Sequence, residues 1–472
     1  MISSEANPLY KTGGLGDVIY SLSRKMSVYK HRVYIALPYY KNMLVEERRL
    51  YIEHPMDLDV MFNGVKKRCQ LHQVNIDNIT FLLFKNVEFF GRDQIYGYED
   101  DKERFAYFNV CVLEYLKRFK GGFDVIHCND WHSAMIPYLM KRKITKKFTR
   151  NPKFVLTIHN PVFMGYMKEE IACKYYSLDS IEKIYVNNYG DISTLKMGIV
   201  NSDWVTTVSP THAKELLTDA KLFNLDDVLI PAKEKFSGIL NGIDTKEFNP
   251  DKDLKIALTY NKENVISHKI INKKNLINLL HLQNSDRPLF GCVCRVSSQK
   301  GVDLIANTIE QMIENNCNFV FLGKGDKELE QQLLAMERKY PHNVSINLEY
   351  SDSLAHQIYA SSDFFLMPSK FEPCGISQMI AMRYGTLPIV REVGGLKDTV
   401  IPYNGFNEDK ATGLSFYEFS SNALWSTIKF ALRLYSKKRI FSKLVHNALD
   451  QDNSWTNSYF EYLSIYQKIC SK

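Results

Sequence analysis

The sequence lacks paired cysteine motifs. None of its nine cysteines forms a C-x-x-C pair, so the spacing typical of a zinc knuckle or a redox dithiol is absent. We therefore expect reduced, mostly buried thiols in a cytoplasmic protein. The cysteines are Cys69, Cys111, Cys128, Cys173, Cys292, Cys294, Cys317, Cys374 and Cys470.

Long apolar runs are also absent. No stretch reaches the ~18 uninterrupted apolar residues that a membrane-spanning helix needs. The chain opens Met-Ile-Ser-Ser-Glu, without the basic and then apolar segments of an export signal. We expect no membrane partner and a cytoplasmic location. A plastid stroma would fit only if a transit peptide had been removed.

Charge of one sign is not concentrated. The formal charge of +7 comes from 60 basic and 53 acidic residues, which supports only a weak attraction to anions. The densest basic patch, Lys141–Lys143 with Lys146 and Lys147, has no interleaved aromatic residues. A solvated helix end is favoured there over a nucleic-acid surface, and no nucleic-acid partner is expected.

What the sequence does contain is an alternation of short β-branched or aromatic runs with longer helix-period segments, which predicts an α/β fold with parallel sheets. Several runs end in polar residues or glycine, and the carboxyl ends of parallel strands are where ligands bind. The predicted strands are Val33–Leu37, Phe123–His127, Phe154–His159, Trp204–Ser209, Phe290–Arg295, Asn318–Leu322, Asp363–Met367 and Thr386–Val390.

The length of 472 residues and the 45% hydrophobic content predict two large domains. A polar segment between about Asn249 and Arg287 separates two strand-rich halves. We place the first domain at 1–248 and the second at 249–454. The remaining residues, 455–472, carry apolar side chains at helical spacing, so we expect a helix that packs back onto the first domain.

A glycine-rich loop near the start of the chain is the first candidate binding motif. Lys11–Asp17 reads Lys-Thr-Gly-Gly-Leu-Gly-Asp and precedes an apolar stripe at helical spacing. Backbone N–H groups of such a loop can approach a diphosphate, and the helix dipole adds positive potential. A plain turn remains an equal alternative. The spacing is neither the G-x-G-x-x-G of dinucleotide binders nor that of P-loop proteins.

This loop resembles the signature of bacterial glycogen synthases and plant starch synthases, with Ser4 and Glu5 just upstream as in that family. Further blocks run in family order along nearly the whole chain. They are Ala36–Tyr40, Ile95–Tyr98, Glu103–Ala106, His127–His132, Thr157–Asn160, Val208–Thr211, Leu240–Asp244, Gln299–Gly301 and Phe371–Gly375.

The resemblance implies the GT-B architecture: two Rossmann-like domains facing across a deep cleft, with the acceptor glucan on the first domain and the donor nucleotide on the second. It implies transfer of glucose from ADP-glucose to the non-reducing end of an α-1,4-glucan with retention of configuration. No metal or other cofactor is expected. Cationic side chains and helix amino termini then have to stabilise the departing nucleoside diphosphate.

Four residues are the catalytic candidates. Arg295 ends a strand and Lys300 follows five residues later, so both cations can reach one diphosphate. By resemblance, Glu372 contacts the donor glucose, and His159 lies near the transferred sugar without acting as a general base. On local grounds alone, a strand-end histidine is more often structural.

The remaining candidates also follow from the resemblance. Asp17 is expected to cap or orient the glycine loop, and an aromatic face beside a carboxylate suits a glucan. On local grounds, core packing at a strand end is an equal alternative for these aromatic and carboxylate residues. The candidates for the donor are Lys11, Gly13, Gly14, Asn241, Cys374, Gly375, Ile376 and Ser377. Those for the acceptor or cleft are Glu5, Asp17, Tyr96, Asp130 and Trp131.

Alternatives stay open at this point. A catalytically silent, glucan-binding relative would keep the same fold, and UDP-glucose is not distinguished from ADP-glucose. The sequence gives no support for a phosphorylase, and it lacks the G-x-G-x-x-G motif of a nicotinamide dehydrogenase. The chain departs from related transferases at Met379, where many carry a second glutamate, and Pro161 directly follows Asn160. Its first strand is a stub, so we expect either a misassigned or truncated start or a weakened edge of the first sheet.

Overall fold

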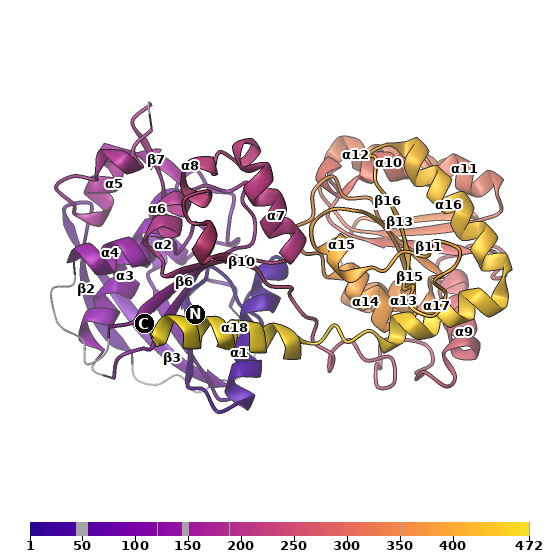
Figure 1. Cartoon of the computed structure of the whole chain (residues 1–472), viewed down its shortest axis with the longest axis horizontal. Helices are drawn as coiled ribbons and strands as arrows, with labels where there is room; N and C mark the ends of the chain where they lie inside the picture. The colour runs from indigo at the N-terminus through magenta and orange to yellow at the C-terminus, as the bar shows by residue number, and fades with distance from the viewer. Residues whose placement is uncertain (44–54, 120, 144–150, 188, 350, 472) are drawn as a thin grey trace. The chain divides into compact units, whose positions relative to one another are not determined.

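The computed structural model describes residues 1–43, 55–119, 121–143, 151–187, 189–349 and 351–471. The chain forms two compact units, Met1–Asn241 with Trp455–Lys472, and Gly242–Ser454 (Figure 1). The division falls between Asn241 and Gly242, whereas the sequence suggested 248. Lys146 and Lys147 lie outside the described residues.

The first unit is built on a sheet with a parallel half and a mixed half. Its parallel half has the order β10-β9-β6-β5, and the other half has the order β1-β4-β3-β2. The parallel strands are β5 (Val125–Asn129), β6 (Lys153–Ile158), β9 (Trp204–Thr207) and β10 (Phe236–Gly238), with β1 (Val33–Pro38) parallel to β4 (Ile79–Lys85).

The amino-terminal stub joins these two halves. Ile2 bridges Ala36 of β1 on one side and Cys128 of β5 on the other. The Ile2 amide donates to the His127 carbonyl at 2.8 Å, and the Ser3 amide donates to the Ala36 carbonyl at 3.1 Å. The expectation of a weakened sheet edge is therefore wrong in its location, because the stub lies in the interior of the sheet.

An antiparallel meander, which the sequence analysis missed, extends the first sheet. It consists of β2 (Met56–Phe62), β3 (Val65–Ile76) and β4. Asn63 and Gly64 form its first turn with φ of 50° and 72°, and Asp77 and Asn78 form the second with φ of 51° and 60°. Two positive φ values favour a tight hairpin turn, and Asn-Gly between alternating residues was the available signal.

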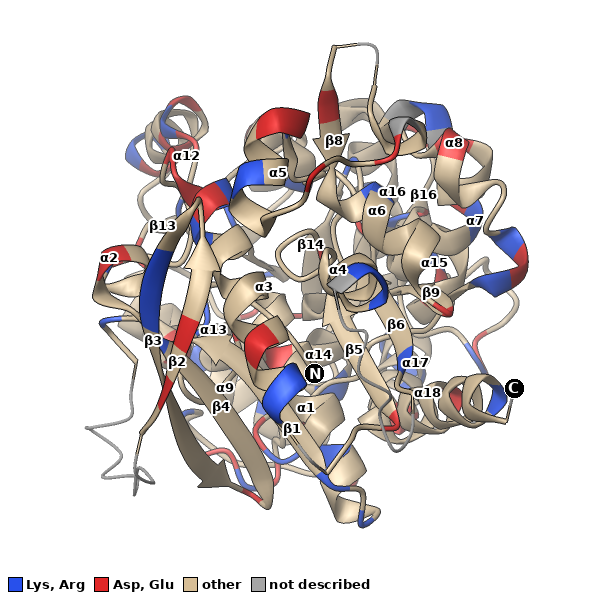
Figure 2. Cartoon of the chain, turned by 90° about the vertical axis from the view of Figure 1, so that its left-hand side faces the viewer, with Lys and Arg blue, Asp and Glu red and all other residues tan. Residues whose placement is uncertain are grey.

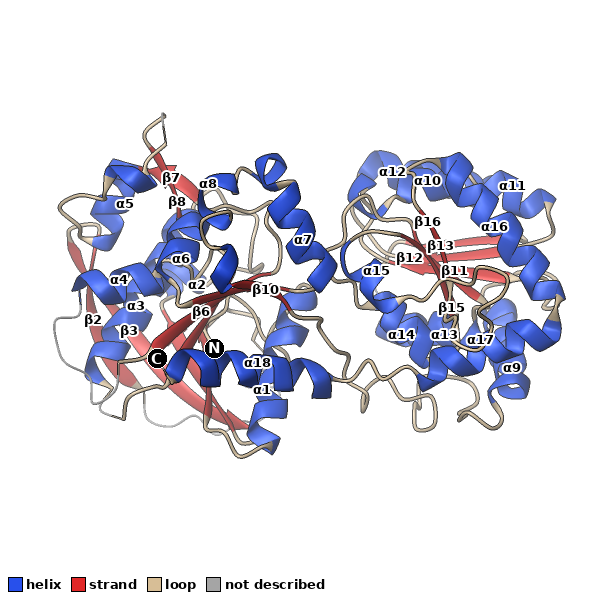
Figure 3. Cartoon of the chain, in the orientation of Figure 1, coloured by secondary structure: helices blue, strands red, loops and turns tan. Residues whose placement is uncertain are grey.

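Helices cover this sheet (Figure 3). A small hairpin, β7 (Tyr166–Lys168) with β8 (Asp191–Ser193), frames α5. The helices are α1 (Gly14–Val28), α2 (Val87–Phe90), α3 (Asp101–Arg118), α4 (Ile136–Lys143), α5 (Glu169–Tyr176), α6 (Thr194–Asn201), α7 (Pro210–Thr218) and α8 (Asp226–Leu229). Acidic and basic residues are interspersed over the unit, as Figure 2 shows.

The last helix, α18 (Trp455–Cys470), belongs to the first unit, as predicted. It packs against α1 (Figure 1). There the Tyr459 ring stacks on that of Tyr29, with ring centroids 4.4 Å apart. The Tyr466 hydroxyl bonds to His127 Nδ1 at 2.7 Å. The buried side chains Trp455, Tyr462, Ile465 and Ile469 complete the core of the first unit.

The second unit has one six-stranded parallel sheet in the order β13-β12-β11-β14-β15-β16. Counted along the chain from β11, this is the 3-2-1-4-5-6 order of the doubly wound Rossmann fold. The strands are β11 (Leu289–Val293), β12 (Asn318–Leu322), β13 (Val344–Asn347), β14 (Phe364–Met367), β15 (Leu387–Arg391) and β16 (Leu414–Phe416). The predicted parallel α/β fold is confirmed.

Helices cover this second sheet as well (Figure 3). They are α9 (Val265–Leu279), α10 (Val302–Ala306), α11 (Ile309–Glu314), α12 (Lys327–Lys339), α13 (Asp352–Ser361), α14 (Ser377–Arg383), α15 (Gly394–Thr399), α16 (Ser421–Ser436) and α17 (Lys438–Asp450). Within the described ranges, no helix combines the length and the hydropathy needed to cross a bilayer.

Candidate active site

The switch point of the second sheet lies between β11 and β14, where the strand order reverses. In doubly wound folds the ligand crevice opens at this point, outside the carboxyl ends of the strands. Two of the predicted catalytic residues lie on the loops that follow these strands. Lys300 Nζ contacts Glu372 Oε2 at 2.5 Å, and their side chains are 22% and 7% exposed. The fold therefore brings Lys300 and Glu372 together where a ligand is expected.

The two loops are held together by their backbones. The Lys370 amide donates to the Gln299 carbonyl at 2.8 Å. Gly301 has a φ of 69°, and a Cβ there would lie 2.2 Å from the Pro368 carbonyl oxygen. Only glycine allows this approach, so Gly301 fixes the position of the neighbouring Lys300.

Glu372 is further held by its own loop. Ser369 Oγ donates to Glu372 Oε2 at 3.2 Å, so Oε2 receives two hydrogen bonds. The Glu372 backbone packs against the start of α15, where a Cβ at Gly394 would lie 2.0 Å from the Glu372 carbonyl oxygen. The Gly395 amide donates to the same carbonyl at 3.2 Å. The sequence analysis missed this Gly-Gly pair, although a double glycine soon after a strand was a usable signal.

Arg295 lies on the loop after β11 and is exposed. Its Nη2 is 3.4 Å from Gln299 Oε1. It shares this loop with Lys300, but the structure gives no contact between Arg295 and the Lys300–Glu372 pair. Its predicted role toward a diphosphate stays a prediction.

The segment 374–377 turns into α14. Gly375 has a φ of 73°, and the Gln378 amide nitrogen donates to the carbonyls of Cys374 and Gly375, both at 3.1 Å. Cys374 is buried, so its predicted donor contact stays a prediction. Ile376 and Ser377 are partly exposed at the start of the helix, where predicted donor contacts lie.

In the first unit, His159 and Asp130 are adjacent at the ends of β6 and β5. Asp130 Oδ1 accepts the His159 amide at 2.7 Å and the Asn160 amide at 3.3 Å. His159 Nε2 lies 2.9 Å from Asn129 Oδ1. Because the Asn129 amide nitrogen donates to the Ile2 and His127 carbonyls, its oxygen faces the ring. His159 therefore carries its proton on Nε2.

Desolvation sets the charge state of these groups. It lowers the pKa of His159 to about 3, so the ring is neutral near pH 7. Burial raises the pKa of Asp130 to about 7, against the two amide hydrogen bonds that favour its ionised form. The His159 ring is thus a hydrogen-bonding group rather than a cation.

Tyr96 and Trp131 belong to one aromatic cluster. Tyr96 Oη is 2.6 Å from Ser4 Oγ, and its ring lies 5.1 Å from that of His132. Trp131 packs edge-on against Phe105 at 5.4 Å. Both candidate acceptor residues are partly exposed.

The glycine loop binds a carboxylate of its own chain. Glu5 Oε2 accepts the Thr12 amide at 2.5 Å and the Thr12 hydroxyl at 3.0 Å. Burial raises the pKa of Glu5, while the amides of Thr12 and Gly13 oppose this shift. The loop is thus an anion-binding turn, with Glu5 at the amides of Thr12 and Gly13. Gly14 begins α1 directly behind them.

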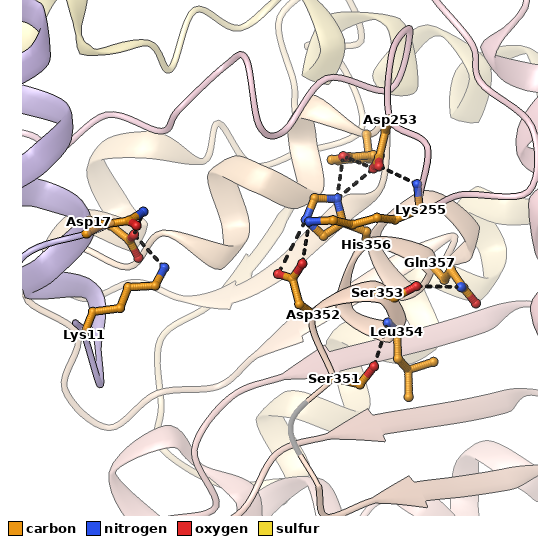
Figure 4. A network of polar contacts seen from close by, with 12 residues as sticks. Lys11, Asp17, Asp253, Lys255, Ser351, Asp352, Ser353, Leu354, His356 and Gln357 are labelled. Atoms are coloured by element: carbon orange, nitrogen blue, oxygen red, sulfur yellow. Dashed lines mark hydrogen bonds and ion pairs between the residues drawn. The ribbon is translucent and has the colours of Figure 1, made fainter. Parts of the chain in front are cut away.

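Lys11 and Asp17 form an ion pair across this loop, with Nζ and Oδ1 2.6 Å apart (Figure 4). Asn7 Nδ2 donates to the same oxygen at 3.1 Å. Asp17 therefore orients Lys11, whereas α1 begins without a side-chain cap and the predicted role of Asp17 toward the glycine loop stays a prediction. Asn241, where the chain leaves the first unit for the second, has a buried Oδ1 without a hydrogen-bond partner among the described residues.

A polar cluster that the sequence did not reveal anchors the start of the second unit (Figure 4). Asp253 Oδ2 accepts hydrogen bonds from His356 Nδ1 at 2.7 Å and from the Tyr384 hydroxyl at 2.5 Å. His356 Nε2 faces the Lys255 ammonium at 3.3 Å, and Lys255 also pairs with Asp352. Glu247, Asp352 and His356 are the group among the described residues whose side chains could together ligate a metal ion. Lys255 already supplies positive charge beside them.

Family models match most of the chain. The starch synthase catalytic domain matches residues 1–231, and the glycosyl transferases group 1 domain matches residues 277–445. The glycogen synthase of Lactococcus lactis is 40% identical over 475 residues, covering 99% of each chain. That of Clostridium kluyveri is 40% identical over 474 residues, covering 99% of this chain and 98% of its own.

Solved structures agree with this relationship. The catalytic domain of starch synthase IV from Arabidopsis thaliana, bound to ADP and acarbose, superimposes with a TM-score of 0.92 at 31% identity, covering 100% of this chain and 99% of its own. Sucrose-phosphate synthase from Thermosynechococcus elongatus, at a TM-score of 0.64 and 17% identity, shares the fold. The chain therefore belongs to the glycogen and starch synthase family, as its motifs indicated, and is a glucosyltransferase with two Rossmann-like units.

Proposed function

We propose that the chain transfers glucose from ADP-glucose to the non-reducing end of an α-1,4-glucan with retention of configuration. The observation that carries the donor half of this proposal is the Lys300–Glu372 pair at the switch point of a 3-2-1-4-5-6 sheet. The solved starch synthase with ADP and acarbose supports a nucleotide donor and a glucan acceptor.

In this proposal the second unit binds the nucleotide sugar. Departure of ADP builds negative charge on the diphosphate, and Lys300 with Arg295 stabilises it. Lys300 is already positioned by Glu372, so little further ordering is needed when the donor binds. The two hydrogen bonds to Glu372 engage Oε2, and Oε1 accepts a hydroxyl of the donor glucose.

The first unit binds the glucan. Tyr96 and Trp131 offer aromatic surface to a sugar ring, and Asp130 holds the His159 backbone. His159 is neutral, and its Nδ1 accepts a hydrogen bond from a sugar hydroxyl. Retention then follows from attack on the same face of the sugar, guided by the departing phosphate oxygen, without a covalent intermediate.

We further propose that no metal or other cofactor takes part and that the protein works in the cytoplasm. Cationic side chains supply the charge that a metal would otherwise provide. The nine cysteines are free thiols, which suits a reducing compartment.

The test incubates the purified protein with radiolabelled ADP-glucose or UDP-glucose and a maltooligosaccharide primer, with and without EDTA. We expect label in elongated glucan from ADP-glucose and no effect of EDTA. Digestion of the product by an α-1,4-specific amylase checks the linkage and configuration. Transfer from UDP-glucose alone would overturn the donor assignment, and binding of glucan without transfer from either donor would indicate a catalytically silent relative.

A further inference from the structure

Two thiols meet at the end of β11, next to a predicted donor residue. Cys292 Sγ and Cys294 Sγ lie 3.7 Å apart, close enough for a hydrogen bond between sulfur atoms. Their spacing is C-x-C and differs from the C-x-x-C of common redox dithiols. Because successive side chains of a strand alternate between its faces, residues 292 and 294 lie on the same side of β11.

The two thiols differ in their surroundings. Cys292 is buried, whereas Cys294 is partly exposed on the loop that carries Arg295. The hydrogen bond with Cys294 and burial raise the pKa of the Cys292 thiol, while the positive charge of Lys300 opposes this shift. A dissolved oxidant therefore meets Cys294 first, with the Cys292 thiol beside it as a resolving partner. Since its charge acts on Cys292, Lys300 also lies close to the pair.

The backbone that follows β11 is held on both sides of Arg295. The Cys294 amide and the Val296 amide donate to backbone carbonyls at and just after the end of β12, at 3.1 and 3.0 Å. The Cys294 carbonyl packs closely on Gly323, where a Cβ would lie 1.8 Å from its oxygen. Arg295 takes its position from these two anchored neighbours.

A disulfide between the two thiols would move this backbone. Residues two positions apart in a strand have Cα atoms ~6.6 Å apart, near the upper end of the ~4.4–6.8 Å usual for disulfides. Forming the bond therefore draws Cys294 toward Cys292 and disturbs its contact with Gly323. A disulfide under such constraint is readily reduced, so its formation would be reversible.

We propose that Cys292 and Cys294 form a peroxide-sensitive modification site, whose disulfide displaces Arg295 and Lys300 from the donor. The Cys294 thiolate attacks one oxygen of hydrogen peroxide, the O–O bond breaks, and Cys294 becomes a sulfenic acid. The Cys292 sulfur then attacks the Cys294 sulfur, so that the S–S bond forms and the S–O bond breaks. The peroxide takes up two electrons, and both thiol protons leave in two molecules of water. The effect on the donor rests on the proposed function, whereas formation of the disulfide does not.

The test treats the purified protein with hydrogen peroxide, alkylates the remaining thiols in denaturant and follows tryptic peptides by mass spectrometry. No lysine or arginine separates residues 292 and 294, so both cysteines stay on one peptide. That peptide should lose two hydrogens and escape alkylation, while kcat/KM for the donor falls by about tenfold or more. Dithiothreitol should reverse both changes. Cys69 and Cys111 also bond to each other but are fully buried, so they should stay reduced as an internal control.

Variants separate this site from the other thiols. Cys294→Ser should slow inactivation by peroxide about fivefold or more, because the thiol that meets the oxidant is gone. Cys470→Ser removes an exposed thiol on α18 and should leave the rate of inactivation unchanged. Cys292→Ala leaves Cys294 without its resolving partner, so a sulfenic acid that dimedone traps should accumulate at Cys294.

Two outcomes would overturn the proposal. One is an unchanged peptide 292–294 after peroxide has inactivated the protein, and the other is a disulfide that leaves donor binding unaltered. Calorimetric titration with ADP measures that binding even if the wild-type protein transfers no glucose, and the disulfide should weaken it. Failure of the modification site and failure of the proposed activity are therefore distinguishable.

Discussion

Lys300 has two roles beside Glu372 in the second unit: it compensates a buried charge, and it stays open to a ligand. The carboxylate is nearly buried, so the ammonium both compensates its charge and remains accessible to a ligand. A partly buried pair of this kind depends on both members, because removing one leaves the other charge without compensation.

Lys300→Ala should lower kcat/KM for the sugar nucleotide by about 100-fold, in line with losses of a charged group that stabilises developing negative charge. Because this change leaves Glu372 unpaired, the double variant Lys300→Ala with Glu372→Gln should recover stability but not activity. Lys339→Ala on α12, which breaks an exposed pair with Glu310 on α11, is the control. Steady-state kinetics with unaltered donor kcat/KM would remove Lys300 from the phosphate site.

The shifted pKa of Asp130 predicts how the stability of the folded protein depends on pH. Its folded-state pKa of about 7 lies above the ordinary value of about 3.9, so the folded state keeps the proton to a higher pH than the unfolded state. Raising the pH through this interval therefore destabilises the folded protein, by up to about 4 kcal/mol.

Asp130→Asn keeps the acceptor oxygen but does not titrate. Its free energy of unfolding relative to wild type should accordingly increase between pH 4 and pH 8. Denaturant unfolding at several pH values measures this difference, which cancels contributions from His159 and His132, whose pKa values of about 3 give the opposite slope. A difference that is constant with pH would show that Asp130 is ionised throughout.

At this scale, the sequence identified the residue types but not their pairings. The pairing of Lys300 with Glu372, of Lys11 with Asp17 and of Glu5 with the Thr12 amide depends on tertiary contacts. The neutrality of His159 follows from desolvation, which a sequence does not reveal. The individual roles of the predicted site residues stay predictions.

At the scale of elements, glycines with positive φ position the loops of the second unit. Gly301 lies between Lys300 and α10, directly against the loop that carries Glu372. Gly405 has a φ of 98°, but a Cβ there would meet nothing within 4 Å. The two positions thus separate backbone strain from steric displacement.

Gly301→Ala should lower the free energy of unfolding by more than about 2 kcal/mol and raise the KM for the donor, since it displaces Lys300. Gly405→Ala should cost about 1 kcal/mol and leave the KM unchanged. Chemical denaturation and steady-state kinetics measure both effects. Equal costs at the two sites would mean that the loop after β14 yields without moving Lys300.

Strands with continuous apolar character were predicted well. Asn318–Leu322 agrees with β12, and Asp363–Met367 differs from β14 by one residue. The meander β2–β4 was missed, although β2 alternates buried and exposed residues and β4 is almost continuously buried. Its last strand pairs in parallel with β1, a long-range contact that no local pattern encodes.

At the scale of the whole molecule, the chain visits the first unit twice. Helices α17 and α18 are neighbours in sequence but belong to different units, and only four residues, 451–454, separate them. A substitution in α17 should therefore destabilise the second unit, and a substitution in α18 should destabilise the first.

Tyr462→Ala on α18 removes a fully buried ring and should destabilise the first unit by about 3–5 kcal/mol. Leu444→Ala on α17, also fully buried, should destabilise the second unit by about 2–5 kcal/mol. Hydrogen exchange followed by mass spectrometry assigns each loss to its unit. If both substitutions increased exchange in the same unit, the division at residues 454 and 455 would be wrong.

The return of the chain to the first unit has a consequence for synthesis on the ribosome. The second unit is one uninterrupted stretch and can acquire its structure as soon as it emerges. The first unit, although translated earlier, must wait for the final eighteen residues before α18 covers α1 and the Tyr466 hydroxyl reaches His127. The half of the enzyme that is made first is therefore the last to be finished, and premature termination near residue 455 would release a chain with an intact second unit and a first unit that lacks the apolar residues of α18.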